Sequence, residues 1–306
     1  VRDGLSLFAG DARANATALG DTSLRMGSIE QLSNAMFNDL IQSGFASEDR
    51  HFVDLAITER DSGRALLGRD RLGIKPMYLS SDAHRIRFAS TLPALVAGGG
   101  VDTRIDPVAL HHYLTFHSVV PAPLTILRGV RKLPPASLLA IEPDGTQTET
   151  TYWSPEFTRR EDRADWTEND WEDAVLEALR TAVRRRLVAD VPVGCLLSGG
   201  LDSSLIVGLL AEAGQAGLRT FSIGFESVGG VRGDEFTYSD IVAERFGTDH
   251  HQIRIDTARM LPALDGAIGA MSEPMVSHDC VAFYLLSQEV AKHVKVVQSG
   301  QGADEV

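Results

Sequence analysis

From Trp171 onward, the chain alternates between apolar segments of strand length and amphipathic segments of helix length. Strands are expected at 193–198, 219–225, 251–255 and 294–299, and helices at 171–188, 203–214, 238–247, 260–271 and 281–293. Aliphatic strands that are joined by helices favour a parallel sheet with helices on both faces. The pattern therefore predicts an α/β fold for this half of the chain.

The first half of the chain has a different pattern. Residues 52–73 predict a hairpin with an Asp-Ser-Gly turn, and residues 138–153 predict another with a Pro-Asp-Gly turn. Helices are expected at 28–41 and from Asp106-Pro107, where Asp can cap and Pro fits the first turn. We expect an α+β domain at 1–153, a charged linker at 154–170 and the parallel-sheet domain at 171–306.

Charge and cysteine content narrow the class of protein. Lys and Arg total 29 against 42 Asp and Glu, a formal charge of −13, which argues against binding to nucleic acid or to an anionic membrane. No apolar run has the length needed to cross a bilayer. Cys195 and Cys280 both lie in apolar stretches, which indicates reduced core thiols in a cytoplasmic protein.

The strongest local signal is the segment LSGGLDSS at 197–204, between an apolar strand and an apolar helix. Gly199 and Gly200 allow a tight turn with accessible backbone N–H groups. Ser203 and Ser204 open the helix, whose positive end favours an anion such as pyrophosphate. Asp202 fits such a site if Mg²⁺ bridges its carboxylate to phosphate oxygens. A strand-to-helix turn with a capping serine is the alternative.

A second loop, SGQGADE at 299–305, follows the last predicted strand. It therefore lies at the carboxyl end of a strand, where open parallel sheets bind ligands. Asp304 offers a second carboxylate for Mg²⁺, and Ser299 and Gly300 lie near the nucleotide. The two loops together predict one site.

These residues resemble a known family. SGGLDSS, TFSIGF and SGQGADE, in this order, resemble the synthetase domain of glutamine-dependent asparagine synthetases. RDRLGIKPMY at 69–78 resembles a segment of their amino-terminal glutaminase domain. The resemblance implies an ATP-pyrophosphatase domain after an incomplete amino-terminal-nucleophile glutaminase domain, with both ends of the chain truncated.

The resemblance also implies a mechanism. The adenine and ribose of ATP are expected near Leu197, Ile223, Ser299 and Gly300, and Mg²⁺ between Asp202 and Asp304. The pyrophosphate is expected on residues 198–203, with Ser198, Gly199, Gly200 and Ser203, and Ser204 is a further nucleotide-binding residue. A small-molecule carboxylate attacks the α-phosphate to give an acyl-adenylate, and ammonia, derived from glutamine in the family, displaces AMP. A homodimer is left open.

The chain departs from the family in two places. Val1 stands where the family has its nucleophilic cysteine, so no glutaminase residue is assigned. Gln301 replaces a glutamate near the reacting carboxylate, which suggests a substrate without a free α-amine, such as N-acetylglutaminylglutamine; SEPMVSHDC at 272–280 resembles that group too. β-Lactam ring closure and a non-catalytic nucleotide-binding protein are the alternatives.

Overall fold

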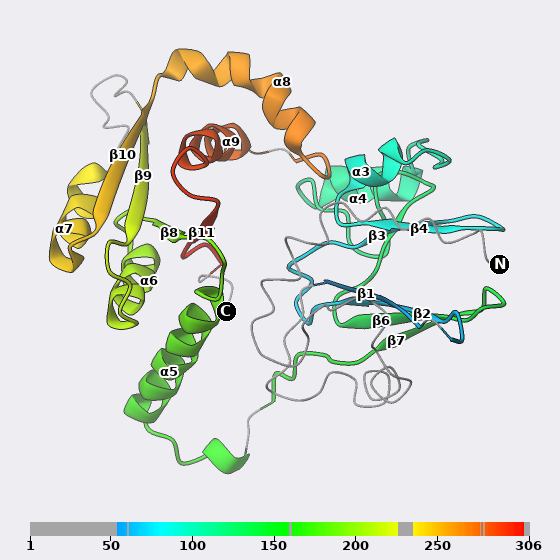
Figure 1. The fold of residues 1–306 in the computed structure, drawn as a ribbon, viewed down its shortest axis with the longest axis horizontal. Helices are drawn as coiled ribbons and strands as arrows, with labels where there is room; N and C mark the ends of the chain where they lie inside the picture. Colours follow the sequence, from blue (N-terminus) through cyan, green and yellow to red (C-terminus); the bar gives the residue numbers. More distant parts are fainter. Residues whose placement is uncertain are drawn as a thin grey trace. The chain divides into compact units, whose positions relative to one another are not determined.

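The structure is a computed structural model that describes residues 54–59, 61–158, 161–225, 235–275, 277 and 279–302 (Figure 1). It divides into two compact units. The first unit runs to Phe157 and also includes Met271–Met275, whereas Thr158–Ala270 and the residues from Ser277 belong to the second. The helix predicted at 28–41 lies outside the described residues.

A four-stranded antiparallel sheet forms one layer of the first unit. Its strands, in the order β1-β2-β6-β7, are β1 (Asp54–Thr58), β2 (Ala65–Arg69), β6 (Ser137–Ile141) and β7 (Gln147–Thr151). β1 pairs with β2 and β6 pairs with β7, so both predicted hairpins are confirmed. Gly63 has a φ of 72° in the first turn, a conformation that favours glycine.

A three-stranded sheet of order β4-β3-β5 forms the other layer of this unit. It consists of β3 (Tyr78–Ser81), β4 (Ile86–Ala89) and β5 (Arg131–Lys132). Two helices follow β4: α3 (Leu92–Ala97) and α4 (Pro107–Thr115). As predicted, Asp106 caps α4, because its carboxylate accepts from Val108 N and Ala109 N at 2.9 Å each.

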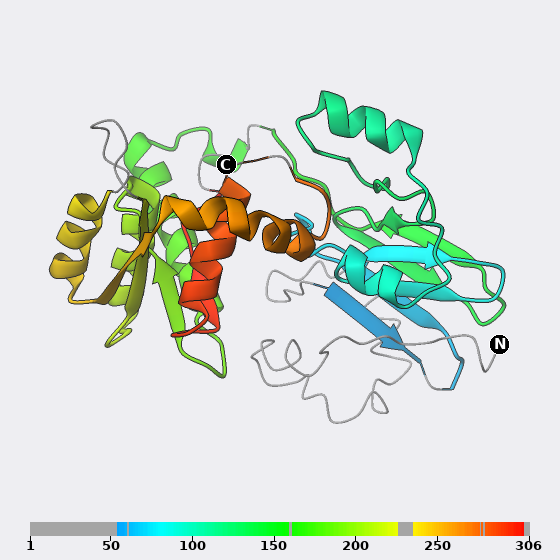
Figure 2. The same cartoon turned by 90° about the horizontal axis from the view of Figure 1, so that it is seen from above.

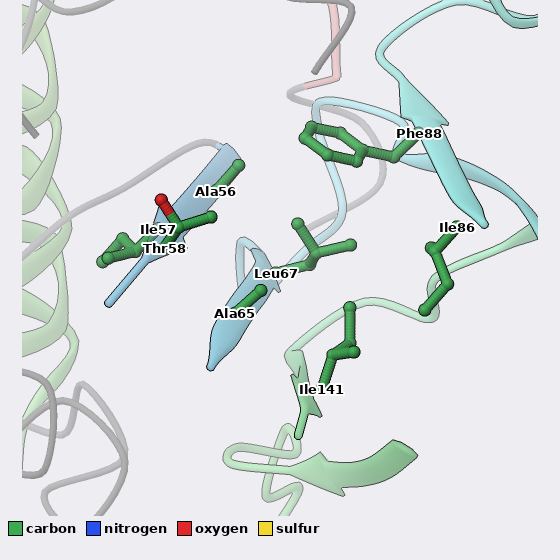
Figure 3. Close-up of a pocket in the computed structure, with 8 residues that line it drawn as sticks. All are labelled: Ala56, Ile57, Thr58, Ala65, Leu67, Ile86, Phe88 and Ile141. Carbon is green, nitrogen blue, oxygen red and sulfur yellow. The ribbon is translucent and has the colours of Figure 1, made fainter. Parts of the chain in front are cut away.

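The space between these two sheets is apolar. Figure 3 shows Leu67 and Ile141, from one sheet, around a pocket that is also lined by Ile86 and Phe88, from the other. The full lining is Ala56, Ile57, Thr58, Ala65, Leu67, Ile86, Phe88 and Ile141. None of the lining residues in the described part of the chain is charged, so the pocket is an apolar part of the core and does not suit a phosphate.

A tight loop follows β2 and is held by two buried charged side chains. The Arg69 guanidinium donates to the carbonyl oxygens of Lys75, Leu133 and Gly73, at 3.0, 2.6 and 2.7 Å. The Asp70 carboxylate accepts from backbone N–H groups, including that of Ile74 at 3.0 Å. These side chains serve the backbone of the loop, which accounts for the RDRLGIKP segment without any ligand.

The second unit is built on a parallel sheet of order β10-β9-β8-β11, as the alternation of apolar segments predicts. Its elements in chain order are η2 (Glu161–Arg163), α5 (Glu168–Arg186), β8 (Val193–Leu196), α6 (Leu201–Glu212), β9 (Arg219–Phe225), α7 (Phe236–Phe246), β10 (Asp249–Ile255), η3 (Thr257–Arg259), α8 (Met260–Ala270), α9 (Asp279–Val290) and β11 (Val296–Gln298).

Helices cover both faces of this sheet, and a separate core lies on each face. Cys195 packs with side chains of α5, α6 and α7, whereas its neighbour Leu196 packs with side chains of α9. Successive residues of a strand point to opposite faces, so β8 contributes to both cores. Figure 2 shows α7 (yellow) and α9 (red) on opposite sides of the strands. The α/β fold class is confirmed.

None of the helices in the described residues is long and apolar enough to span a membrane. Cys195 is fully buried, and burial raises the pKa of its thiol to about 12. A thiol with such a pKa is protonated at neutral pH and serves in packing, as predicted, because the thiolate is the nucleophilic form.

Candidate nucleotide site

The connection between β8 and α6 begins at Leu197, which is held by burial and by a hydrogen bond with β9. Leu197 is 1% exposed, and its N–H donates to the carbonyl of Phe221 in β9 at 2.8 Å. Residues 198–200 then turn the chain into α6, which begins at Leu201. The loop therefore leaves the carboxyl edge of the sheet at a point that β9 determines.

Gly199 needs its lack of a side chain. Its φ is +90°, and a Cβ atom would lie 2.6 Å from the backbone N of Ser239 and 2.6 Å from Cβ of Tyr238. Real Cβ atoms do not approach other atoms so closely. Glycine thus lets the loop pass directly against the first turns of α7.

Among the described residues, no side chain caps the N–H groups at the amino-terminal end of α6. Gly200 is the N-cap of this helix. The first helical hydrogen bond runs from Ser204 N to Gly200 O at 3.0 Å, so the N–H groups of Leu201, Asp202 and Ser203 have no partner within the helix. Free donors at the positive end of a helix form an anion-binding site.

The serine hydroxyls hold this turn in shape. Ser198 Oγ accepts from Gly200 N at 3.2 Å and lies 3.0 Å from Ser203 Oγ. Ser203 Oγ and Ser204 Oγ both donate to Gly200 O, at 3.2 and 2.7 Å. The contact of these serines with pyrophosphate remains a prediction from the sequence; in the structure their hydroxyls form hydrogen bonds within the turn.

The second predicted loop lies beside the first. β11 pairs with β8 in parallel, with Gln298 opposite Cys195, so both loops leave the same edge of the sheet. A Cβ atom on Gly300 would lie 2.8 Å from Cβ of Asp202 and 2.8 Å from the N of Ser203. The backbone at Gly300 therefore packs against the first turn of α6.

The remaining predicted residues have varied surroundings. Ser299 and Gln301 are exposed on the second loop. Ile223, expected near the adenine, is half-buried and packs against the core shared by β10, α8 and α9. Asp202 is half-exposed at the start of α6. Asp304 lies outside the described residues.

The described residues can be tested for their fit to Mg²⁺. No group of three or more His, Cys, Asp or Glu side chains that could hold a metal by itself is found in the described part of the chain. Mg²⁺ is commonly bound through one or two carboxylates together with substrate phosphates and water. Asp202, beside the free N–H groups of α6, fits a magnesium ion that arrives with a nucleotide.

A buried polar cluster beneath the loop was not identified from the sequence. It consists of Thr220 and Ser222 in β9, Ser239 in α7 and His250 in β10, joined by hydrogen bonds. The signal that predicts it is the spacing of Thr220 and Ser222, two polar residues on one face of an otherwise apolar strand.

Both halves of the chain are similar to known protein families. Residues 174–306 match the asparagine synthase family, and residues 50–153 match the glutamine amidotransferase domain. Glutamine-hydrolysing asparagine synthetase 1 of Bacillus subtilis is 33% identical over 241 residues, which cover 78% of this chain and 36% of that protein.

The chain belongs to the asparagine synthetase family. Glutamine-hydrolysing asparagine synthetase 3 of B. subtilis is 30% identical over 80% of this chain and 41% of that protein. Amidase chyE of Penicillium rubens is 27% identical over 80% of this chain and 38% of that protein. The chain thus spans about two-fifths of the length of these asparagine synthetase relatives.

Among solved structures, the ammonia-dependent NAD synthetase of Campylobacter jejuni is similar to part of the chain. It is 16% identical with a TM-score of 0.29, over 42% of this chain and 55% of that one. This likeness is too weak to carry an argument, so the assignment to the asparagine synthetase family rests on the sequence matches.

Proposed function

We propose that the chain catalyses the ATP-dependent amidation of a carboxylate through an acyl-adenylate, with release of AMP and pyrophosphate. The observation that supports this most directly is the uncapped start of α6 with the second loop packed against it. Free N–H groups at a strand-to-helix turn suit a polyphosphate, and the family match supplies the class of reaction.

In the proposed reaction, an oxygen of the substrate carboxylate attacks the α-phosphorus of ATP, and the bond to the bridging oxygen of pyrophosphate breaks. The N–H groups of Leu201, Asp202 and Ser203 receive the departing negative charge. Ammonia then attacks the activated carbonyl carbon, AMP leaves, and the amide nitrogen loses one proton to solvent. The site acts mainly by positioning and by neutralising charge.

Mg²⁺ would be held by Asp202, with Asp304 as the proposed second carboxylate, and would neutralise the phosphate oxygens when bound. Leu197, Ile223, Ser299 and Gly300 remain the proposed neighbours of the adenosine. Ile223 packs partly into the core formed by β10, α8 and α9, so only the remaining part of its side chain is proposed to contact the base or ribose.

Glutamine is the proposed source of ammonia, because residues 50–153 match the glutamine amidotransferase domain. Free ammonia is the alternative donor. The proposed division into a glutaminase domain at 1–153, a linker at 154–170 and a synthetase domain at 171–306 assigns the donor half and the ATP half to different parts of the chain. We name no glutaminase nucleophile, and we propose a cytoplasmic location.

Gln301 favours a substrate without a free α-amine. It is exposed on the second loop, one residue after Gly300, which packs against Asp202. A neutral amide in place of a carboxylate removes the negative charge that would attract an α-ammonium group. An N-blocked peptide such as N-acetylglutaminylglutamine is therefore the proposed substrate class, ahead of aspartate.

Pyrophosphate release from ATP and Mg²⁺ tests the proposal. We expect release to depend on an added carboxylate, and to respond to N-acetylglutaminylglutamine more than to aspartate. Asp202→Asn should lower the rate by about 100-fold, the size of effect seen when a key charge-stabilising group is lost. Asp265→Asn, an exposed site on α8, is the matched control and should retain the wild-type rate.

Three outcomes would distinguish the proposed amidation from the alternative functions or contradict the proposed site. ATP binding without carboxylate-dependent pyrophosphate would support a non-catalytic protein. Turnover that needs neither glutamine nor ammonia and gives a cyclic amide would support β-lactam ring closure. Full activity in the Asp202→Asn variant would contradict the proposed site.

A further inference from the structure

A row of buried polar side chains lies directly beneath the loop at 198–200. Thr220 and Ser239 are 0% exposed, Ser222 is 4% exposed, and the side chain of His250 is 9% exposed. Burying four polar side chains is costly unless each is hydrogen-bonded. The cluster must therefore be satisfied internally, and His250 lies at its centre.

Both ring nitrogens of His250 have partners. Nδ1 lies 2.8 Å from Thr220 Oγ1, which in turn lies 2.8 Å from Thr248 Oγ1. Nε2 lies 3.2 Å from Ser222 Oγ and 3.2 Å from Ser239 Oγ. One imidazole thus connects β9 with α7.

The hydroxyl protons of Ser222 and Ser239 form hydrogen bonds with backbone carbonyls and not with His250. Ser222 Oγ donates to the carbonyl of Leu197, and Ser239 Oγ donates to the carbonyl of Phe236 at 3.1 Å. Both serine oxygens can therefore accept from His250, which favours the tautomer with the proton on Nε2. Nδ1 then accepts from Thr220, whose hydroxyl accepts from Thr248.

The ring that satisfies this network is neutral, with its proton on Nε2. Burial lowers the pKa of His250 below its ordinary value of 6.5, which agrees with a neutral ring. The Asp240 carboxylate, 3.9 Å from Nε2, and a hydrogen bond with the Thr220 backbone both oppose this lowering of the pKa, whereas the neighbouring His251 adds to it.

The two serines touch the loop from different sides. The Leu197 carbonyl that Ser222 holds immediately precedes Ser198. The backbone N of Ser239 is the atom that a Cβ on Gly199 would meet at 2.6 Å. His250 thus bridges the two elements, β9 and α7, that confine the loop.

We propose that His250 is a positioning residue that holds the loop at 198–200 in its anion-binding conformation. The inference rests on the proposed function, because it assigns His250 a part in ATP binding without any contact with ATP. The alternative is a histidine that contributes to core stability alone. The two differ in whether nucleotide affinity changes more than stability requires.

His250→Ala tests this, with His251→Ala as the matched control. His251 is the next residue of β10 and points to the opposite face, where its ring stacks on Phe221 at 5.2 Å. Titration calorimetry with inorganic pyrophosphate and with ATP, each with Mg²⁺, gives Kd, and thermal unfolding gives Tm. We expect His250→Ala to raise Kd at least about tenfold, about 1.4 kcal/mol, and His251→Ala to leave Kd within about twofold.

If His250→Ala fails to fold, two more conservative variants still test the proposed role of His250. Ser222→Ala removes the hydroxyl that links His250 to the Leu197 carbonyl and should also raise Kd. His250→Gln can place an amide N–H near the position of Nε2 and should restore part of the affinity.

The result that would overturn the inference is a wild-type Kd in Ser222→Ala and in every folded His250 variant, even where Tm has fallen. That result would leave the proposed function standing. If the unsubstituted chain itself binds neither ATP nor pyrophosphate, the proposed function fails first and the inference fails with it.

Discussion

Lys132 Nζ lies 2.9 Å from Glu273 Oε2, although 141 residues separate the two in sequence. Their side chains are only 11% and 24% exposed, and Lys132 also donates to the carbonyl of Val120 at 2.5 Å. The next residue back, Ser272, accepts from Leu92 N at 3.1 Å. Charge pairing and hydrogen bonds thus hold the segment after α8 within the first unit.

Lys132→Ala should destabilise the protein substantially. The substitution leaves the Glu273 carboxylate largely buried without its cation, and Oε1 already has no hydrogen-bond partner among the residues that the structure describes. We expect the free energy of unfolding to fall by about 3 kcal/mol, measured by urea denaturation. Glu273→Gln in the same chain should recover part of the loss, because the orphaned charge is then gone.

Lys292→Ala is the control for that pair. Lys292 also forms an ion pair, with Glu289, but its side chain is 63% exposed. An exposed pair contributes little, so we expect a change below about 1 kcal/mol. Equal effects of the two lysine substitutions would contradict the importance of burial at Lys132.

Gly300→Ala should weaken nucleotide binding. The new Cβ would lie 2.8 Å from Cβ of Asp202 and from the N of Ser203, so one loop must move away from the other. We expect Kd for ATP with Mg²⁺ to rise at least about tenfold by calorimetry. Gly269→Ala, on α8, is the control: nothing lies within 4 Å of its added Cβ, and it should leave Kd unchanged.

Arg69→Lys should show that the RDRLGIKP loop is structural. A lysine ammonium cannot reproduce the guanidinium fork that reaches the carbonyls of Lys75, Leu133 and Gly73. With two such bonds lost, the free energy of unfolding should drop by about 3 kcal/mol in urea. Arg85→Lys, at an exposed position, should be neutral; an unchanged stability for both would refute this role.

Stability should depend on pH through His250. Its pKa is lowered in the folded protein, chiefly by burial, so below pH 6.5 the unfolded chain binds a proton that the folded chain resists. The stabilisation from the neutral ring is therefore full above pH 6.5 and is lost as pH falls toward the folded pKa. Urea midpoints of His250→Gln should fall less steeply over this range than those of the unsubstituted chain, and parallel curves would exclude the effect.

The sequence predicts the parallel sheet well because its strands are apolar and its helices periodic. The strand expected at 219–225 coincides with β9. β5, with two residues, is too short to show any alternation and was missed. The sequence predicts the glycine loop because two adjacent glycines between a strand and a helix indicate a tight turn, and Gly199 has a φ of 90°, which favours glycine.

The sequence pattern did not predict contacts between residues that are far apart in the chain. The structure pairs Glu273 with Lys132, 141 residues away, and no spacing in the sequence indicates this ion pair. The direction of the Ser203 and Ser204 hydroxyls, toward Gly200 O, likewise depends on coordinates. Residue type and spacing locate a loop at the sheet edge, but the partner of each polar side chain depends on the packing of elements far apart in the chain.

Gln301→Glu should shift substrate preference toward aspartate, because we propose that the neutral side chain at position 301 favours a substrate without a free α-amine. Gln301 is exposed beside Gly300, and a carboxylate there would attract an α-ammonium group, whereas an N-blocked peptide gains nothing from it. We expect the ratio of kcat/KM for aspartate to that for N-acetylglutaminylglutamine to rise about tenfold in a pyrophosphate-release assay, which corresponds to about 1.4 kcal/mol. Gln215→Glu, exposed just after α6, adds the same charge at the opposite end of that helix and serves as the control. A ratio that stays constant in Gln301→Glu, or that rises equally in Gln215→Glu, would mean that the charge at position 301 does not select the substrate.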